Sequence, residues 1–283
     1  MEIISTVAGL REAVANARKD GKRIGLVPTM GALHDGHMSL VTKAKSDCEF
    51  VVVSVFVNPT QFNNPDDLRT YPRTVDADCA RLEAAGVDVA FVPTVEEIYP
   101  EPDTRVFDLG PVAEVMEGAM RPGHFNGVAQ IVSKLFAMVE PDKAYFGEKD
   151  YQQIAVIRRM ATLEGFDIDI VDCPIKREAD GLAMSSRNVR LSADQRAIAP
   201  QIHKELADSL DLVGKLEPGE VAAKVTERIN AVPGMEVEYY QIVDAETLQP
   251  AADWSRPTVG CVTVWMGDVR LIDNIKYKAV AQA

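Results

Sequence analysis

Two histidines three residues apart precede a predicted helix, in the stretch PTMGALHDGH at residues 28–37. The stretch lies between an apolar segment and an amphipathic one, which is typical of a strand-to-helix connection. Gly31 and Gly36 allow the backbone to approach a ligand closely. A helix N-terminus adds N–H groups and the positive end of a dipole. With His34 and His37 as further donors, the stretch predicts a phosphate site that stabilises charge on a phosphorus atom.

A second polar stretch, GLAMSSRN at residues 181–188, combines two hydroxyls and a guanidinium beside a flexible turn. Such groups suit the oxygens of a polyphosphate. Alone, this composition is that of an ordinary loop, and the first stretch alone could be a helix cap with incidental histidines. However, the chain has only four histidines, and two of them fall in the first stretch. We therefore interpret the two stretches together.

The elements that must position these residues alternate along the chain. Strands are expected at 23–28, 50–57, 87–92, 143–146 and 167–171, and helices from a cap at residue 5 or 6 to 21 and at 37–46, 75–85, 127–139 and 151–164. The run at 50–57 is continuous and β-branched, as in a strand buried on both faces. This alternation predicts an α/β fold with a doubly wound parallel sheet.

Ligands of such sheets bind outside the carboxyl ends of the strands, at the point where the strand order reverses. Three polar segments, at 28–37, 58–62 and 147–153, directly follow predicted strands. We therefore expect the three segments to meet in one crevice.

The sequence changes character beyond about residue 192. The elements expected there are helices at about 193–212 and 217–231, followed by strands at 237–243 and 260–266. Helices followed by antiparallel strands predict a smaller α+β domain. We place the two domains at 1–178 and 179–283, with the serine-rich stretch at the start of the second.

Composition narrows the class of protein. The formal net charge of −13 repels phosphate backbones, so we expect no nucleic-acid partner, although a local basic pocket could still bind a small anion. No apolar run approaches the roughly 18–20 residues that cross a bilayer, so no membrane is expected either. The four cysteines form no CxxC pair, which predicts reduced, mostly buried thiols and a cytoplasmic protein.

Six blocks of the sequence, in order, resemble those of a known family. The histidine and serine-rich stretches resemble the HIGH-type and KMSKS-type signatures of class I aminoacyl-tRNA synthetases and related nucleotidyltransferases, which bind ATP in a Rossmann-like domain. Within that superfamily the chain resembles the pantothenate synthetases. The blocks are VPTMGALHDGH at 27–37, FVNPTQF at 56–62, YPRT at 71–74, GHFNGV at 123–128, FGEKDYQQ at 146–153 and READGLAMSSRN at 177–188. Thr60 is a departure, because the family commonly has a bulkier residue there.

The resemblance implies a ligase that joins pantoate to β-alanine through a pantoyl adenylate, splitting ATP into AMP and pyrophosphate with Mg²⁺, and acting as a homodimer. The implied ATP-binding residues are Met30, Gly31, His34, Gly36, His37, Gly147, Glu148, Lys149, Asp150, Lys176, Met184, Ser185, Ser186 and Arg187. Asn58, Gln61 and Gln153 would bind pantoate, with Gln61 also near β-alanine. The implied catalytic residues are His34, His37 and Lys149. We expect the histidines mainly to stabilise charge, because a carboxylate at neutral pH attacks phosphorus without losing a proton.

Two carboxylates, Asp76 and Asp78, could hold Mg²⁺, and Asp78 is the better candidate. Nucleotide enzymes hold Mg²⁺ largely through substrate phosphates with one or two carboxylates. The simpler interpretation is that both are favourable charges in the first turn of a helix. His124 is expected to be a cap or packing residue.

The polar segment at 63–74 follows the predicted pantoate-binding strand end. We expect it to act as a lid that is mobile in the empty enzyme and ordered over the adenylate, which water would otherwise hydrolyse. The alternative is a permanently packed excursion, held by Leu68 and Tyr71.

Two other functions are open at this point. A nucleotidyltransferase would keep both phosphate-binding stretches but would not need Gln61 and Gln153, and its product would keep the nucleotide. A non-catalytic, RNA-binding relative of the synthetases is disfavoured by the acidic balance and by the lack of a basic stripe.

Overall fold

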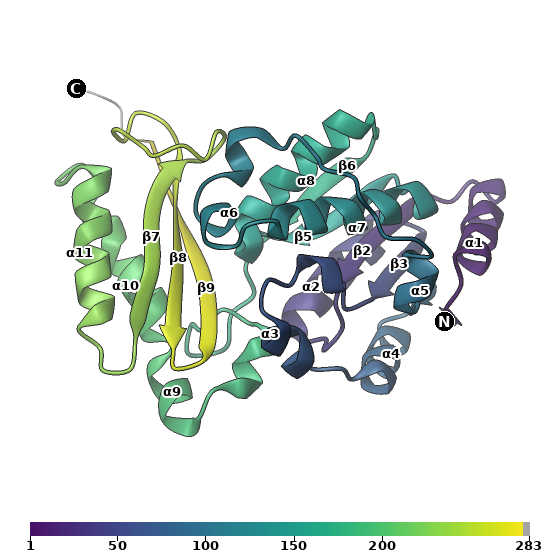
Figure 1. Ribbon diagram of the computed structural model, residues 1–283, viewed down its shortest axis with the longest axis horizontal. Coiled ribbons are helices and arrows are strands. Elements are labelled where there is room, and N and C mark those ends of the chain that lie inside the picture. The colour runs from purple at the N-terminus through teal and green to yellow at the C-terminus, as the bar shows by residue number, and fades with distance from the viewer. Residues whose placement is uncertain (280–283) are drawn as a thin grey trace. The chain divides into compact units, whose positions relative to one another are not determined.

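The computed structural model describes residues 1–279, which divide into two compact units (Figure 1). The first unit comprises Met1–Leu109, Arg121–Glu148 and Gln153–Pro174. The second comprises Gly110–Met120, Lys149–Gln152 and the chain from Ile175 onward. The segments Gly110–Met120 and Lys149–Gln152 thus belong to the second unit although the chain before and after each of them belongs to the first. A domain boundary at residue 178 remains a prediction.

The sheet of the first unit has six parallel strands in the order β1-β4-β3-β2-β5-β6. The strands are β1 (Glu2–Ile4), β2 (Ile24–Thr29), β3 (Phe50–Val55), β4 (Val89–Phe91), β5 (Lys143–Gly147) and β6 (Asp169–Cys173). The helices in the same part of the chain are α1 (Val7–Lys19), α2 (Asp35–Asp47), α3 (Pro65–Thr70), α4 (Val75–Ala84), α5 (Val95–Ile98), α7 (His124–Val139) and α8 (Tyr151–Glu164). The predicted α/β class with a parallel, doubly wound sheet is confirmed.

Apolar side chains hold the helices to the central strands. Leu40, Val41 and Ala44 of α2 share one core cluster with Val51 and Val53 of β3. Residues of α4 join the same cluster, so α2 and α4 cover one face of the sheet. Helices α1 and α7 contact each other and β2. Burial on both faces explains why β3 is apolar at every position except Ser54.

The strand order reverses at β2. From β2 the chain continues to β3 on one side, and it later returns to pair with β2 on the other side as β5. Because all three strands are parallel, the segments that follow them leave the same edge of the sheet. The three segments that the sequence analysis predicted to bind ligands follow these three strands, which is where ligands bind in open parallel sheets.

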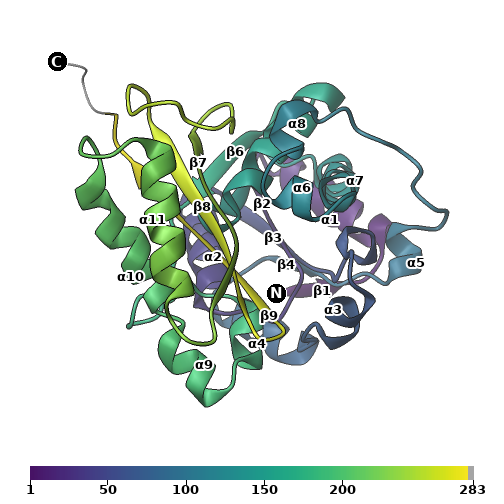
Figure 2. The ribbon, with the colours of Figure 1, turned by 60° about the vertical axis from the view of Figure 1, so that its left-hand side comes forward.

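The second unit contains an antiparallel sheet of β7 (Glu236–Asp244), β8 (Thr258–Met266) and β9 (Val269–Tyr277), in that order. Its helices are α6 (Glu117–Met120), α9 (Ala193–Ile198), α10 (Gln201–Asp208) and α11 (Pro218–Asn230). Figures 1 and 2 show α10 and α11 packed along the sheet. Pro200 lies between α9 and α10 and divides the single helix that the sequence predicted there. In the part of the chain that the structure describes, no helix has the length and apolar character of a membrane span.

A buried carboxylate joins α6 to this sheet. Glu117 accepts hydrogen bonds from Arg270 Nη1 and Nη2, both at 2.7 Å, and from the Tyr239 hydroxyl at 2.7 Å. The Thr263 hydroxyl donates to the same carboxylate at 3.0 Å. A charge buried to this degree is stable only with such partners. The ion pair therefore makes the early segment 110–120 an integral part of the second unit.

Candidate active site

The two histidines of the turn after β2 cap the start of α2. His34 is the N-cap residue, and its Nδ1 accepts the backbone N–H of Gly36 at 3.1 Å. The Nδ1 of His37 accepts the backbone N–H of His34 at 3.3 Å, and the two ring centroids lie 4.1 Å apart. Because each Nδ1 is an acceptor, each neutral ring carries its proton on Nε2. The pair therefore carries two Nε2–H donors in a fixed orientation beside a helix N-terminus.

The turn itself is shaped by Asp78. Gly31 and Ala32 have φ values of 78° and 50°, in the left-handed region, and the amides of Ala32 and Leu33 both point toward Asp78. Asp78 is buried there, with Oδ2 accepting from the Ala32 amide at 2.9 Å and Oδ1 from the Leu33 amide at 2.8 Å. The Thr74 hydroxyl donates to Oδ1 at 3.2 Å. Asp78 thus holds the turn after β2, a role that the sequence analysis did not consider.

The amides after β3 lie beside the turn after β2. The Nδ2 of Asn58 donates to Oε1 of Gln61 at 3.1 Å, and the Nε2 of Gln61 contacts the Met30 sulfur at 3.3 Å. Asn58 is almost fully buried, whereas Gln61 is half-buried. The structure therefore brings two of the predicted pantoate-binding residues into contact with a residue predicted to bind ATP.

The residues after β5 divide between the units. Gly147 ends β5, next to β2 in the sheet, and Glu148 follows it in the first unit. Gln152 is buried, and its amide is bonded to three backbone groups of residues 112–117 within the second unit. Gln152 is therefore structural. Of these two adjacent glutamines, the half-buried Gln153 is the one suited to contact a substrate.

Lys149 and Asp150 lie in the second unit, in the short helix η3 (Glu148–Asp150). The Lys149 ammonium lies 3.2 Å from a carboxylate oxygen of Asp150, and its side chain is 19% exposed. The Asn274 amide donates to the Lys149 carbonyl at 3.1 Å, which fixes the backbone there. Lys149 is thus a largely sheltered charge with one exposed acidic neighbour, rather than a freely solvated surface lysine.

The serine-rich stretch is built on a short hairpin of the second unit. The Met184 amide donates to the Lys176 carbonyl at 3.0 Å, and Gly181 closes the hairpin with a φ of 96°. Arg177 anchors the hairpin through two hydrogen bonds to buried Asp273, at 2.6 and 2.9 Å. Lys176 and Met184, both predicted to bind ATP, therefore lie side by side on this hairpin.

The hydroxyl and guanidinium groups of this stretch follow the hairpin directly. Ser185 caps the short helix η4 (Ser186–Arg190), because its Oγ accepts the Arg187 amide at 3.2 Å. Asn188 donates to the Ala183 carbonyl at 3.0 Å, which holds the helix against the hairpin. Ser186 and Arg187 are half-buried at the start of the helix.

The segment expected to be a lid is partly helical. It contains α3, and the buried Tyr71 packs edge-on against Phe62 with ring centroids 5.7 Å apart. The Asn63 amide donates to the Pro122 carbonyl at 2.5 Å. These contacts are of the kind that the packed alternative requires, and motion of the segment remains a prediction.

Three residues to which the sequence analysis gave no role in the site surround Asn58 and Gln61. The Tyr99 hydroxyl donates to Asn58 Oδ1 at 2.8 Å, and the His124 ring lies 2.8 Å from the Gln61 carbonyl. A Cβ at Gly127 would lie 2.5 Å from the Thr60 carbonyl oxygen, so only glycine fits there. Two of them, His124 and Gly127, lie in the block GHFNGV, which was the available sequence signal. His124 packs as expected, and its partner is the candidate site residue Gln61.

Comparison with known proteins decides between the interpretations of this site. A sequence model of the pantoate–β-alanine ligases matches residues 2–276. The chain belongs to this family. It is 62% identical over 280 residues to the pantothenate synthetase of Porphyromonas gingivalis, covering 98% of this chain and 100% of that relative.

Solved structures of other pantoate–β-alanine ligases share the fold. The pantothenate synthetase of Thermus thermophilus matches with a TM-score of 0.91 at 46% identity, over 97% of this chain and 99% of that one. The ligase of Francisella tularensis, solved in complex with beta-gamma ATP and β-alanine, matches with a TM-score of 0.82 at 36% identity, over 97% of each chain. The predicted family and enzyme class are confirmed. The nucleotidyltransferase and RNA-binding alternatives lose their support, because the match extends far beyond the nucleotide-binding stretches.

Proposed function

We propose that this ligase makes pantothenate in two steps, with ATP as the activating substrate. The pantoate carboxylate attacks the α-phosphorus of ATP and pyrophosphate leaves, which gives pantoyl adenylate. The amine of β-alanine then attacks the acyl carbon and AMP leaves. The observation that carries the proposal is the arrangement after β2 and β3, where Met30 of the histidine turn touches the Gln61 amide.

His34 and His37 stabilise negative charge on the phosphates in this mechanism. Their Nδ1 atoms are held by backbone amides, so the Nε2–H donors keep their direction without substrate. Donors that are oriented in advance lower the barrier because they need no reorganisation during the reaction. No general base is required in the first step, since the attacking carboxylate is already ionised at neutral pH.

Asn58, Gln61 and Gln153 bind pantoate. Asn58 occupies the Gln61 Oε1, so the Gln61 Nε2 faces the other way as a donor. Its present acceptor, the Met30 sulfur at 3.3 Å, is a weak one that a hydroxyl or carboxylate oxygen of pantoate can replace. We extend the role of Gln61 to β-alanine, because the amine must attack beside the bound pantoyl group.

ATP is held by backbone at Gly31, Gly36 and Gly147, by Lys149, and by the stretch from Met184 to Arg187, with smaller contributions from Glu148, Asp150 and Lys176. Lys149 supplies positive charge to the phosphates. Among residues 1–279, no group of three or more His, Cys, Asp or Glu side chains could hold a metal ion. Mg²⁺ therefore enters with the ATP phosphates, as is usual for this ion.

Two further properties belong to the proposal. All four cysteines are free and buried, which supports a reducing compartment, and we propose that the enzyme is cytoplasmic. We also propose a homodimer, on the strength of the family resemblance.

Exchange of pyrophosphate into ATP tests the order of the two steps. Pantoate with ATP and Mg²⁺ should support exchange in the absence of β-alanine, and addition of β-alanine should release pantothenate and AMP in equal amounts. An exchange that strictly requires β-alanine would overturn the two-step mechanism.

Substitution of the glutamines tests the substrate assignment. Gln61→Ala and Gln153→Ala should raise the KM for pantoate far more than the KM for ATP, because each removes an amide from the pantoate side only. The control is Gln249→Ala, since the Gln249 amide bonds only within its own exposed turn. An equal rise for both substrates would place these glutamines elsewhere in the site.

A further inference from the structure

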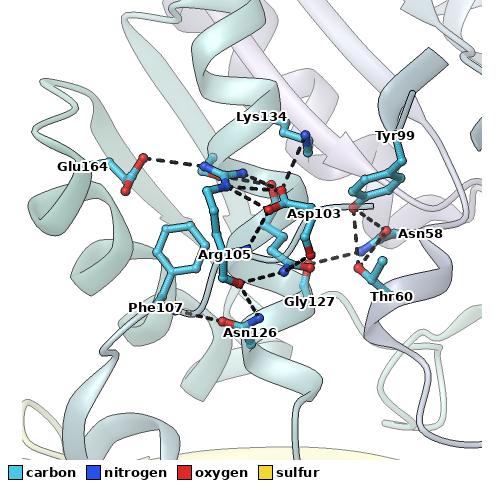
Figure 3. A network of polar contacts seen from close by, with 12 residues as sticks. Asn58, Thr60, Tyr99, Asp103, Arg105, Phe107, Asn126, Gly127, Lys134 and Glu164 are labelled. Carbon is cyan, nitrogen blue, oxygen red and sulfur yellow. Dashed lines mark hydrogen bonds and ion pairs between the residues drawn. The ribbon is translucent and has the colours of Figure 1, made fainter. Parts of the chain in front are cut away.

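The carboxamide of Asn58 uses its full hydrogen-bonding capacity. Its Nδ2 donates to Gln61 Oε1 at 3.1 Å and to the Gly127 carbonyl at 3.2 Å. Its Oδ1 accepts from the Tyr99 hydroxyl at 2.8 Å and from the Thr60 hydroxyl at 3.2 Å. Figure 3 shows the Asn58 amide between Tyr99 and Thr60, with its nitrogen directed toward Gly127. Two donors and two acceptor positions are all that a primary amide has.

These partners leave Asn58 only one orientation. The Gly127 carbonyl can only accept, so the Nδ2 must face it. The second Nδ2 hydrogen then requires Gln61 to present Oε1, which turns the Gln61 Nε2 toward Met30. The direction in which Gln61 offers a donor is thus set through Asn58, which the Gly127 carbonyl orients and which the Tyr99 and Thr60 hydroxyls hold at Oδ1.

The backbone of Gln61 is fixed independently of its side chain. The ring of His124 lies 2.8 Å from the Gln61 carbonyl, and Arg121 donates to the same oxygen at 3.3 Å. Helix α7 also packs against the Thr60 carbonyl at Gly127, too closely for any side chain. Since the backbone is held in place, the orientation of the Gln61 amide depends on its contact with Asn58.

Tyr99 is itself held as a donor. Its ring packs near Phe56 with centroids 6.4 Å apart, and the Lys134 ammonium lies 5.2 Å from the Tyr99 centroid. Lys134 is paired with Asp103 at 3.4 Å, and Figure 3 shows this ion-pair group adjoining Tyr99. Burial raises the pKa of Tyr99, so its hydroxyl keeps the proton that it donates to Asn58.

We propose that Tyr99 and Thr60 are positioning residues for pantoate, which act through Asn58 to present the Gln61 amide nitrogen to the substrate. This inference rests on the proposed role of Gln61 in binding pantoate. Thr60 is the position where the sequence departs from the family pattern, and here its hydroxyl gives Asn58 a second donor.

Substitutions that remove only hydroxyl groups test the proposal. Tyr99→Phe leaves Asn58 Oδ1 with the more distant Thr60 donor, so the KM for pantoate should rise about threefold. In the double variant Tyr99→Phe/Thr60→Val the buried oxygen loses both donors, and the KM should rise roughly tenfold or more, the typical cost of an unpaired buried acceptor. The KM for ATP should change less than about twofold.

Two comparisons separate positioning from general support of the fold. In a Gln61→Ala background the double substitution should change the KM for pantoate less than about twofold, because the group that it orients is gone. Tyr145→Phe is the matched control, since it removes a buried tyrosine hydroxyl of the first unit that bonds Cys48 and Asp47 instead. This control should leave the KM for pantoate and the KM for ATP unchanged, and thermal unfolding should show that every variant is folded.

Each outcome has one meaning. If Gln61→Ala raises the KM for pantoate and Tyr99→Phe/Thr60→Val does not, the positioning proposal is wrong and the role of Gln61 stands. An undiminished effect of the double substitution in the Gln61→Ala background would also overturn it. If Gln61→Ala itself has no effect, the assignment of Gln61 and this inference are both wrong, whereas the formation of pantothenate by the unaltered enzyme decides the ligase function separately.

Discussion

The substitution Asp78→Asn should destabilise the enzyme through the turn after β2. The carboxylate accepts the Ala32 amide at 2.9 Å and the Leu33 amide at 2.8 Å. Asparagine keeps one oxygen but places an NH₂ group against the other amide, so one charge-assisted bond is lost and one sheltered N–H has no acceptor. We expect a loss of about 2–3 kcal/mol in the free energy of unfolding. For a chain of this size the melting temperature should fall by about 4–10 °C.

The matched control is Asp76→Asn. Asp76 is exposed in the first turn of the same helix, α4, so its substitution removes the same charge near the same helix end without touching the turn. That charge is worth about 0.3–1 kcal/mol. Urea and thermal unfolding of the three proteins, measured with and without Mg²⁺, give the two differences directly.

Equal unfolding free energies for Asp78→Asn and Asp76→Asn would refute the role of Asp78 in holding the turn. A second possible outcome would support the interpretation of Asp78 as a Mg²⁺ ligand. In that case Mg²⁺ would stabilise the unaltered enzyme but not Asp78→Asn, and the two proteins would unfold alike in a chelator.

Three further predictions concern charge and motion. The hydrogen bond from Arg105 lowers the pKa of Asp103 to about 2. The stabilisation from the Asp103 carboxylate is therefore present above about pH 4 and is lost as the pH falls toward 2. In urea titrations the difference in unfolding free energy between the unaltered enzyme and Asp103→Asn should shrink over that range. Residues 63–74 should gain hydrogen-exchange protection when ATP and pantoate are added, and strong, equal protection in both states would exclude a lid. Lys149→Ala should fold normally but lose most activity, whereas Lys224→Ala, an exposed charge on α11, should not; near-normal turnover of Lys149→Ala would show that Lys149 is not catalytic.

The fold class was predictable because burial leaves a local pattern in the sequence. The run that forms β3 is apolar except at Ser54, and Thr6, the cap of α1, lies where the pattern of polar and apolar residues changes. Helix α2 begins at Asp35, two residues before the predicted start. Strand β1 was not predicted, because three residues are too few to show a period. Strand β9 was missed for another reason. It contains Asp273, a buried charge whose partner Arg177 lies 96 residues earlier, and such pairing leaves no mark on neighbouring residues.

In the candidate site too, residues marked by a local pattern were predictable and residues placed by long-range contacts were not. Its histidines, glutamines and lysine stand inside recognisable blocks, so their residue types and their places after strands indicated a role. Asp78 and Tyr99 belong to the site only through contacts with residues 45 and 41 positions away. Taken alone, one is an acidic residue in the first turn of a helix and the other an ordinary aromatic. Their importance arises from folding and could not be read from spacing.

The ion pair between Glu117 and Arg270 has a consequence for how the chain folds during its synthesis on the ribosome. Glu117 is synthesised 153 residues before its partner, so the carboxylate must stay hydrated while most of the rest of the chain is made. The second unit therefore cannot mature as a late, self-contained module. A fragment beginning at Ile175 would keep Glu238 as a partner of Arg270 but would lose both hydrogen bonds to Glu117. We therefore expect this fragment to be less stable alone than with the segment 110–120 added in trans.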